Sequence, residues 1–222
     1  SSDVCSSDLN QRHLAAIRDG MVVAIPLSIL GGFCLIISTP PFTPKSLPDW
    51  GVISDLLIGW YNWAQANATA LRLPYNMTMA LMGLFVAIAI AYHLAKRYEM
   101  SGLNAAIVST TVFLLICAPT TTAVLTSAIS EGANTNDLLA QAASFIPTTY
   151  LDAKGIFTAI IVSIGCVEIM RVMLKKNIRF KMPEGVPPAI ASSFDSILPL
   201  FVCMGVFYGV SLIIQNISGE LL

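Results

Sequence analysis

The chain has 222 residues, of which 55% are hydrophobic and only 11% are charged, and its mean hydropathy is +0.74. Soluble domains carry about 45–50% apolar and about 25% charged residues, so this composition excludes an ordinary soluble globular protein. The formal net charge of −1 leaves no excess positive field that would attract nucleic acid. A chain of this kind is counted in membrane spans of about 20 residues.

The first nine residues, SSDVCSSDL, have neither helical nor strand periodicity. They resemble the translation of a sequencing adapter, and residues 1–9 are therefore expected to be an artefact outside the fold. The true N-terminus would then be missing.

Five apolar stretches are long enough to cross a bilayer as helices. They cover residues 21–39, 77–95, 103–125, 155–174 and 196–219. A sixth stretch, residues 52–70, is less apolar because it holds Asp55, Asn62, Gln65 and Asn67, and tryptophans crowd around it. Such a stretch is typical of a helix at headgroup level, so we expect it to be interfacial or re-entrant.

The distribution of basic residues supports five spans, because cytoplasmic loops of membrane proteins are enriched in Lys and Arg. With five spans, Lys45, Arg72 and Lys154 fall on one side and the other nine basic residues on the opposite side. Those nine are Arg12, Arg18, Lys96, Arg97, Arg171, Lys175, Lys176, Arg179 and Lys181. The sequence thus predicts an all-α, polytopic membrane protein with five transmembrane helices, one interfacial helix and a cytoplasmic N-terminus.

Three connections between the spans are distinctive. Residues 39–48 contain four prolines and predict a stiff external connector, and the polar residues 127–149 are also placed outside. On the cytoplasmic side, residues 175–193 read KKNIRFKMPEGVPPAIASS, a basic run followed by a proline-rich turn.

Ionisable residues inside membrane spans are costly, so each is weighed as a functional candidate. Glu168 and Arg171 stand three residues apart on one predicted helix, a spacing that favours a local ion pair over a substrate role. His13 and His93 adjoin basic residues and are interpreted as headgroup-level histidines, and Asp195 as a helix cap.

Small residues recur at helical contact spacing, in Gly83, Ala87 and Ala91 and again in Gly205 and Gly209. Such stripes let helices approach closely, either within one bundle or between protomers, and the sequence leaves both open.

No sequence motif predicts catalysis. We find no phosphate-binding glycine loop, no Ser/His/Asp order and no metal-ligand cluster, and thus expect neither a catalytic residue, a metal nor a cofactor. The five cysteines are expected to be small buried hydrophobes. The residues themselves indicate a transporter or part of one.

The stretch KMPEGVPPAIASSF, residues 181–194, indicates which family of transporters the chain resembles. It resembles the signature of the membrane component IIC of the lactose, cellobiose and diacetylchitobiose family of bacterial phosphoenolpyruvate-dependent sugar phosphotransferase systems. RHLAAIRDGMVVAIPLSILGG, residues 12–32, and YLDAKGIFTAIIVSIGCVEIMR, residues 150–171, agree in order and spacing, although Asp152 stands where glycine is usual.

The resemblance implies a homodimeric permease of about ten spans in the bacterial cytoplasmic membrane, which moves a disaccharide inward and couples transport to phosphorylation. The phosphoryl group would come from a partner IIB protein, charged through IIA, so this chain itself is of uncertain enzyme status. The sugar-contacting residues of the family lie beyond Leu222. The chain would then be a fragment, with residues 10–174 the scaffold and dimerisation part, 175–193 a cytoplasmic connector and 194–222 the fifth span.

Hinge or IIB-docking candidates are confined to the connector, namely Pro183, Glu184, Gly185, Pro187 and Pro188. A rigid turn that only sets the angle of the next helix is the simpler interpretation of these residues. Two alternative functions also stay open, an unrelated ion-coupled secondary transporter and an inactive structural fragment.

Overall fold

The computed structural model describes residues 2–48, 50–117, 150–178 and 196–218, with side chains placed between residues 11 and 214. Within these ranges the chain is helical and has no strand, as the all-α prediction requires. The helices are α1 (Ser2–Val22), α2 (Ala24–Ser38), α3 (Val52–Ala66), α4 (Ala68–Thr78), α5 (Met82–Arg97), α6 (Gly102–Cys117), α9 (Ile156–Lys175) and α11 (Ile197–Ser218). Short 3-10 turns lie at Pro44–Ser46 (η1), Met79–Leu81 (η2) and Ala153–Gly155 (η3).

Four helical stretches among the described residues are long and apolar enough to cross a membrane. They are Gln11–Ser38, Ala68–Arg97, Ala153–Lys175 and Ile197–Ile214. These correspond to four of the five predicted spans. The remaining one, residues 103–125, begins as α6, which is described for only 16 residues. The rest of that predicted span, and residues 127–149 after it, lie outside the described residues.

The first span begins earlier than the sequence predicts. Helix α1 starts at Ser2, within the segment for which we expected no regular element, and it continues into α2 with a single turn residue at Val23. Helix propagation adds one hydrogen bond for each residue fixed, so a helix nucleated by an apolar run extends readily into polar neighbours.

The second span also begins earlier than predicted, because helix α4 contains Pro74 and yet continues toward α5. The proline removes one backbone donor. Near it, the Thr78 hydroxyl donates a hydrogen bond of 2.7 Å to the Pro74 carbonyl, and the chain tightens into η2 before α5 begins. Hydroxyl side chains and local 3-10 turns are the devices that make proline tolerable in membrane helices.

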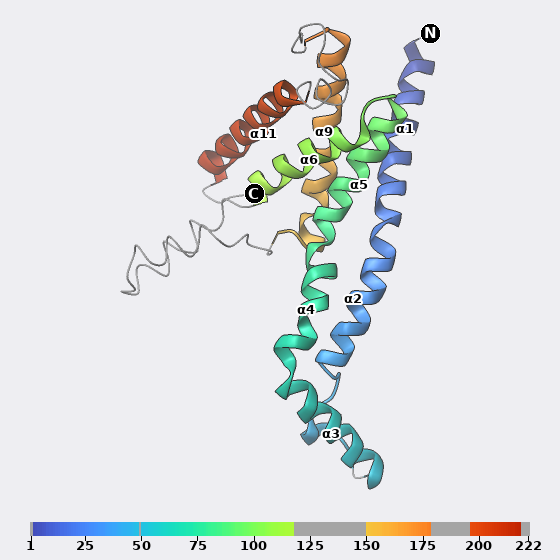
Figure 1. The fold of residues 1–222 in the computed structure, drawn as a ribbon, viewed down its shortest axis with the longest axis vertical. Coiled ribbons are helices and arrows are strands. Elements are labelled where there is room, and N and C mark those ends of the chain that lie inside the picture. The colour runs from blue at the N-terminus through green and yellow to red at the C-terminus, as the bar shows by residue number, and fades with distance from the viewer. Residues whose placement is uncertain (1, 49, 118–149, 179–195, 219–222) are drawn as a thin grey trace, which may run out of the picture.

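Helix α3 covers most of the segment that was expected to be interfacial or re-entrant, but it ends at Ala66 rather than residue 70. It lies at one end of the molecule, below α2 and α4 in Figure 1. Its apolar residues Val52, Ile53 and Leu56 are exposed. The nearby indole N–H of Trp60 donates to the Ile37 carbonyl at 3.2 Å, which ties α3 to the end of α2.

The core of the molecule is formed by α5, α6 and α9, which pack against one another. Phe113, Leu94 and Cys166 are fully buried among them. Ser109 on α6 donates a hydrogen bond of 3.1 Å to Ser163 on α9. Ser163 also lies 3.0 Å from the Ala87 carbonyl of α5, so one buried polar contact joins all three helices.

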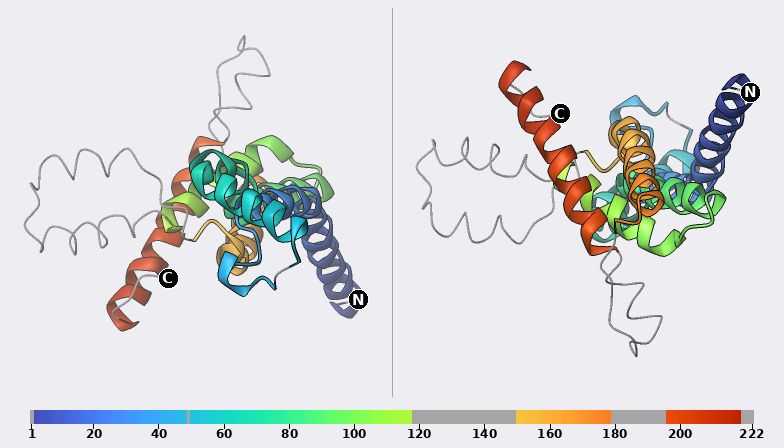
Figure 2. Two further views of the ribbon diagram at one scale, coloured as in Figure 1. Left: turned by 90° about the horizontal axis from the view of Figure 1, so that it is seen from below. Right: turned by 90° about the horizontal axis from the view of Figure 1, so that it is seen from above.

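Helices α1 and α11 flank this core on opposite sides, as the end-on views show (Figure 2). The outward surfaces of α2 and α11 are apolar, with Phe33 of α2 63% exposed and Phe201 of α11 72% exposed. Large exposed apolar side chains on helices of this length suit contact with lipid.

Candidate functional site

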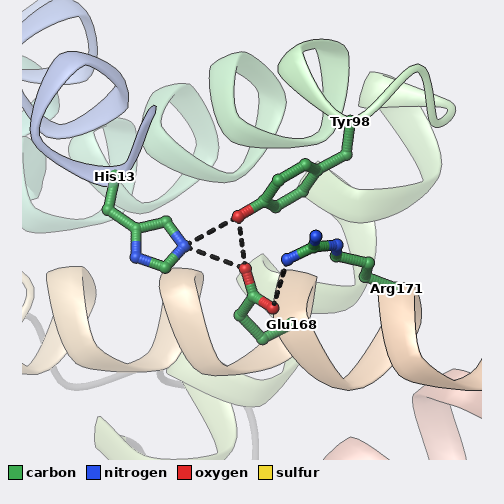
Figure 3. Close-up of polar contacts among 4 residues, drawn as sticks. All are labelled: His13, Tyr98, Glu168 and Arg171. Carbon is green, nitrogen blue, oxygen red and sulfur yellow. Dashed lines mark hydrogen bonds and ion pairs between the residues drawn. The ribbon is translucent and has the colours of Figure 1, made fainter. Parts of the chain in front are cut away.

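The site with the most converging polar groups lies where α1, α5 and α9 come together. Glu168 of α9 accepts a hydrogen bond of 2.6 Å from the Tyr98 hydroxyl at its Oε1 atom. His13 of α1 places its Nε2 atom 2.8 Å from the same carboxylate oxygen and 2.9 Å from the Tyr98 hydroxyl oxygen. Figure 3 shows the three side chains pointing toward one another from different helices.

Arg171 completes this group, which we call the His13 cluster and define as His13, Tyr98, Glu168 and Arg171. Its Nη1 atom donates to Glu168 Oε2 at 3.2 Å, so the predicted pair between these residues is confirmed. The guanidinium also lies 4.1 Å from the centre of the Tyr98 ring, within range of a cation–π contact. The carboxylate therefore has partners on both oxygens.

The end of helix α5 places Tyr98 at this position. Glu99 follows Tyr98 in the left-handed region with φ of 58°, and the Met100 N–H donates to the Ala95 carbonyl at 2.9 Å. This is the common way in which a helix ends and the chain turns away. Arg97, just before, forms an ion pair of 2.6 Å with Asp19, so α1 and α5 are joined a second time.

The environment of Tyr98 changes its acidity. Burial, the hydrogen bond to Glu168 and the negative charge of that carboxylate together raise the pKa of Tyr98 to about 12, with burial the largest cause. Tyr98 therefore remains a hydrogen-bond donor throughout the physiological range. The cluster acts as a stable polar tie between three helices.

An open hollow of about 600 Å³ lies beside the cluster. Four cationic residues line it, Arg12, Arg97, Arg171 and Lys175, together with Glu99 and Tyr98. Arg97 and Arg171 are paired with carboxylates, whereas Arg12 and Lys175 form no hydrogen bond or ion pair with the described residues. This surface, which we call the cationic hollow, can attract an anionic group.

The other sequence candidates do not join the cluster. His93 stacks edge-on against Tyr92, with ring centroids 5.6 Å apart. Pro183, Glu184, Gly185, Pro187 and Pro188 lie outside the described residues, as does Asp195. Within the described part of the chain, no three His, Cys, Asp or Glu side chains gather as a metal site.

Sequence reasoning missed the parts that His13 and Tyr98 play. Both are remote from Glu168 in the chain, by 155 and 70 residues respectively. No local spacing signals such a contact, because only the packing of α1 and α5 on α9 creates it. The basic residues next to His13 favoured the simpler interpretation of a headgroup-level histidine.

Comparison with known proteins identifies the class of membrane protein. A family model described as "Phosphotransferase system, EIIC" matches residues 18–222. The chain belongs to this family, the membrane components of sugar phosphotransferase systems, as the resemblance of its motifs predicts. No comparison supports an unrelated secondary transporter.

Two curated members of the family show which permeases the chain is similar to. The chain is 34% identical to the lichenan permease IIC component of Bacillus subtilis (strain 168) over 92% of its length and 41% of that protein. It is 33% identical to the cellobiose-specific EIIC component of Geobacillus stearothermophilus over 92% of its length and 42% of that protein. The chain thus spans less than half the length of these curated relatives.

A solved structure shares the fold. The crystal structure of the transporter ChbC, the IIC component of an N,N'-diacetylchitobiose-specific phosphotransferase system, aligns with a TM-score of 0.69 and 29% identity. The alignment covers 100% of this chain and 49% of that one.

Proposed function

We propose that this chain is the N-terminal, scaffold part of a IIC permease that carries a disaccharide such as cellobiose, lactose or diacetylchitobiose across the cytoplasmic membrane. The match of the family model to residues 18–222 carries this proposal. The helices support it, because four of them are long and apolar enough to span a bilayer. The sugar-contacting residues would then belong to the part of the permease after Leu222.

The proposed orientation places the N-terminus and the cationic hollow in the cytoplasm. Figure 1 supports it, because the beginning of α1 and the ends of α5 and α9 lie at the same end of the molecule. That end carries Arg12, Arg97 and Lys175, as the positive-inside rule favours for a cytoplasmic face.

The proposed partners are a second copy of the permease and the IIB and IIA components. A IIB protein would deliver the phosphoryl group to the sugar, so the permease itself carries no phosphorylated residue. Arg12 and Lys175, which form no hydrogen bond or ion pair with the described residues, suit an approach by a partner that carries a phosphoryl group.

Uptake into membrane vesicles tests this function. We expect labelled cellobiose to accumulate as its phosphate in vesicles that contain the intact permease, but only when phosphorylated IIB is present on the cytoplasmic side. A vesicle with the permease but unphosphorylated IIB is the matched control. Accumulation of unmodified sugar driven by an ion gradient without IIB would instead support the secondary-transporter alternative.

The connector, residues 175–193, is proposed to act as a hinge or as part of the IIB-docking face. Its basic run and its rigid prolines support this role, since proline restricts φ and stiffens a turn. Replacing both Pro187 and Pro188 by alanine in the intact permease is expected to reduce sugar phosphorylation or IIB association. Unchanged transport and unchanged IIB association would leave only a turn that sets the angle of the next helix.

A further inference from the structure

A second hollow, of about 360 Å³, lies at the opposite end of the molecule from the cationic hollow. It forms where the segment after α2 folds against α3. The side chains that define its chemistry are Thr39, Phe42, Thr43, Ser46, Tyr61 and Gln65. We call it the α3 hollow, and its volume falls in the range of about 300–1,000 Å³ that is typical of ligand pockets.

The wall of the α3 hollow is stiff. Pro40 and Pro41 line it, and Pro44 begins the 3-10 turn η1 directly after Thr43. The Thr43 N–H donates to the Ser46 hydroxyl oxygen at 3.1 Å, and the Ser46 hydroxyl donates back to the Thr43 carbonyl at 2.8 Å. Since proline fixes φ and both ends of the turn are bonded, this wall loses little conformational freedom when a ligand binds.

One aromatic side of the hollow is held in place. The Phe42 ring packs edge-on against Trp60, with centroids 5.6 Å apart and an interplanar angle of 70°. Trp60 is itself anchored, because its indole N–H donates to the Ile37 carbonyl. The Tyr61 ring comes from the next position of α3. The hollow therefore offers aromatic surfaces on both the segment after α2 and helix α3.

The polar groups of the hollow are uncharged and partly unused. Neither the Tyr61 hydroxyl nor the Gln65 amide makes a hydrogen bond with the described residues, and they lie one helical turn apart on α3. The Thr39 hydroxyl donates to the Leu35 carbonyl but keeps acceptor capacity. Lys45 lies in η1 but does not line the hollow, and none of the described residues that line it is charged.

Uncharged hydroxyl and amide groups beside aromatic rings suit one class of ligand, a neutral sugar. A sugar presents hydroxyl groups that both donate and accept hydrogen bonds, and a face of C–H groups that can pack on a ring. An anionic ligand would find no cation among the lining residues, and a lipid chain would leave the amide and hydroxyls unpaired at a cost.

We propose that the α3 hollow is a sugar-binding subsite on the external side of the permease, which holds one unit of the disaccharide before it enters the transport route. This rests on the proposed function and orientation. The subsite is separate from the sugar contacts expected after Leu222, because it is built wholly from residues 39–65 of this chain.

Binding is tested by fluorescence in the intact permease. The chain has three tryptophans, and replacing Trp50 and Trp63 by phenylalanine leaves Trp60, which packs against the lining residue Phe42, as the reporter from this part of the permease. We expect cellobiose to change the Trp60 emission saturably. Tyr61→Ala and Gln65→Ala are each expected to raise the half-saturating concentration about 2–10-fold, the loss of roughly one hydrogen bond. Tyr208→Phe, on α11, is the matched control and should bind as the parent does.

Uptake separates the subsite from the proposed function. In IIB-dependent uptake, Tyr61→Ala is expected to raise the half-saturating cellobiose concentration and to leave the maximal rate within about 2-fold, because its loss affects capture alone. Unchanged half-saturation in both variants, by fluorescence and by uptake, would overturn the subsite, as would an absence of saturable quenching. If sugar quenches Trp60 and the variants weaken the quenching, but the parent transports no sugar, the subsite stands and the proposed function falls.

Discussion

Glu168 is the residue on which α1, α5 and α9 converge. Its carboxylate meets Tyr98 and His13 on one oxygen and Arg171 on the other. A carboxylate within an apolar helix is costly unless its oxygens are satisfied, and here every described partner comes from the same end of the bundle. The side chain is 30% exposed and lies in the last two turns of α9.

The pKa of the Tyr98 hydroxyl provides a test of this arrangement. Its pKa is raised from 10.0 to about 12, so it favours the folded state fully below pH 10 and this contribution is lost as the pH rises toward 12. We expect Glu168→Gln to lower the pKa of Tyr98, because the negative partner is removed while burial remains. The phenolate absorbance of the variant and parent, titrated in detergent, measures the shift.

The control for this titration is Tyr98→Phe, whose difference spectrum from the parent isolates the step that belongs to Tyr98. An unchanged step in Glu168→Gln would contradict the hydrogen bond between the two side chains.

At the scale of elements, two small-residue stripes that look alike in sequence play different parts. Ala87 and Ala91 of α5 are fully buried, and a Cβ atom added at Gly83 would lie 2.9 Å from the Leu151 and Asp152 carbonyl oxygens. This stripe serves packing within the chain. In contrast, nothing among the described residues lies within 4 Å of a Cβ atom added at Gly205 of α11.

Alanine at these two glycines is expected to have opposite effects on stability. Gly83→Ala should lower the free energy of unfolding by about 1–3 kcal/mol, because backbone carbonyls must move to admit the methyl group. Gly205→Ala should be neutral or raise it by about 0.5–1 kcal/mol, through the greater helix preference of alanine. Thermal unfolding in detergent measures both, and an equal loss in the two variants would contradict the packing of Gly83 against Leu151 and Asp152.

At the scale of the whole molecule, the two hollows lie at opposite ends and differ in the chemistry of the residues that line them. One end gathers four cationic residues around an open hollow, whereas the other end presents an uncharged hollow of hydroxyl, amide and aromatic groups. In a membrane, such a difference between ends suits a protein that meets different partners on its two sides.

Cysteine labelling tests this sidedness. With the native cysteines replaced by alanine, Thr43→Cys, at the position directly before η1, is expected to react with an impermeant maleimide in intact cells. Lys176→Cys, directly after α9, should react only after the membrane is opened. Both positions are exposed, so accessibility of the side chain does not limit either reaction. The reverse pattern would invert the proposed orientation.

Much of this organisation could be predicted from the sequence, because its causes are local. The apolar runs predicted the position of every candidate span now described, and the spacing of Glu168 and Arg171 predicted their ion pair. The limits of these elements were less certain. Helix α4 continues past Pro74 to Thr78 and is followed by a 3-10 turn, and the apolar run alone did not predict that the helix would begin before this proline.

The sequence by itself determined that this protein is helical, belongs in a membrane and is a member of the EIIC family, since hydropathy and contiguous motifs are properties of the chain read in order. Only the tertiary structure decided that His13 and Tyr98 share Glu168, and that Phe42 and Tyr61 face one hollow. These contacts join segments far apart in the chain or across a turn. They arise when whole helices pack, and no local pattern of residues encodes which side chains then meet.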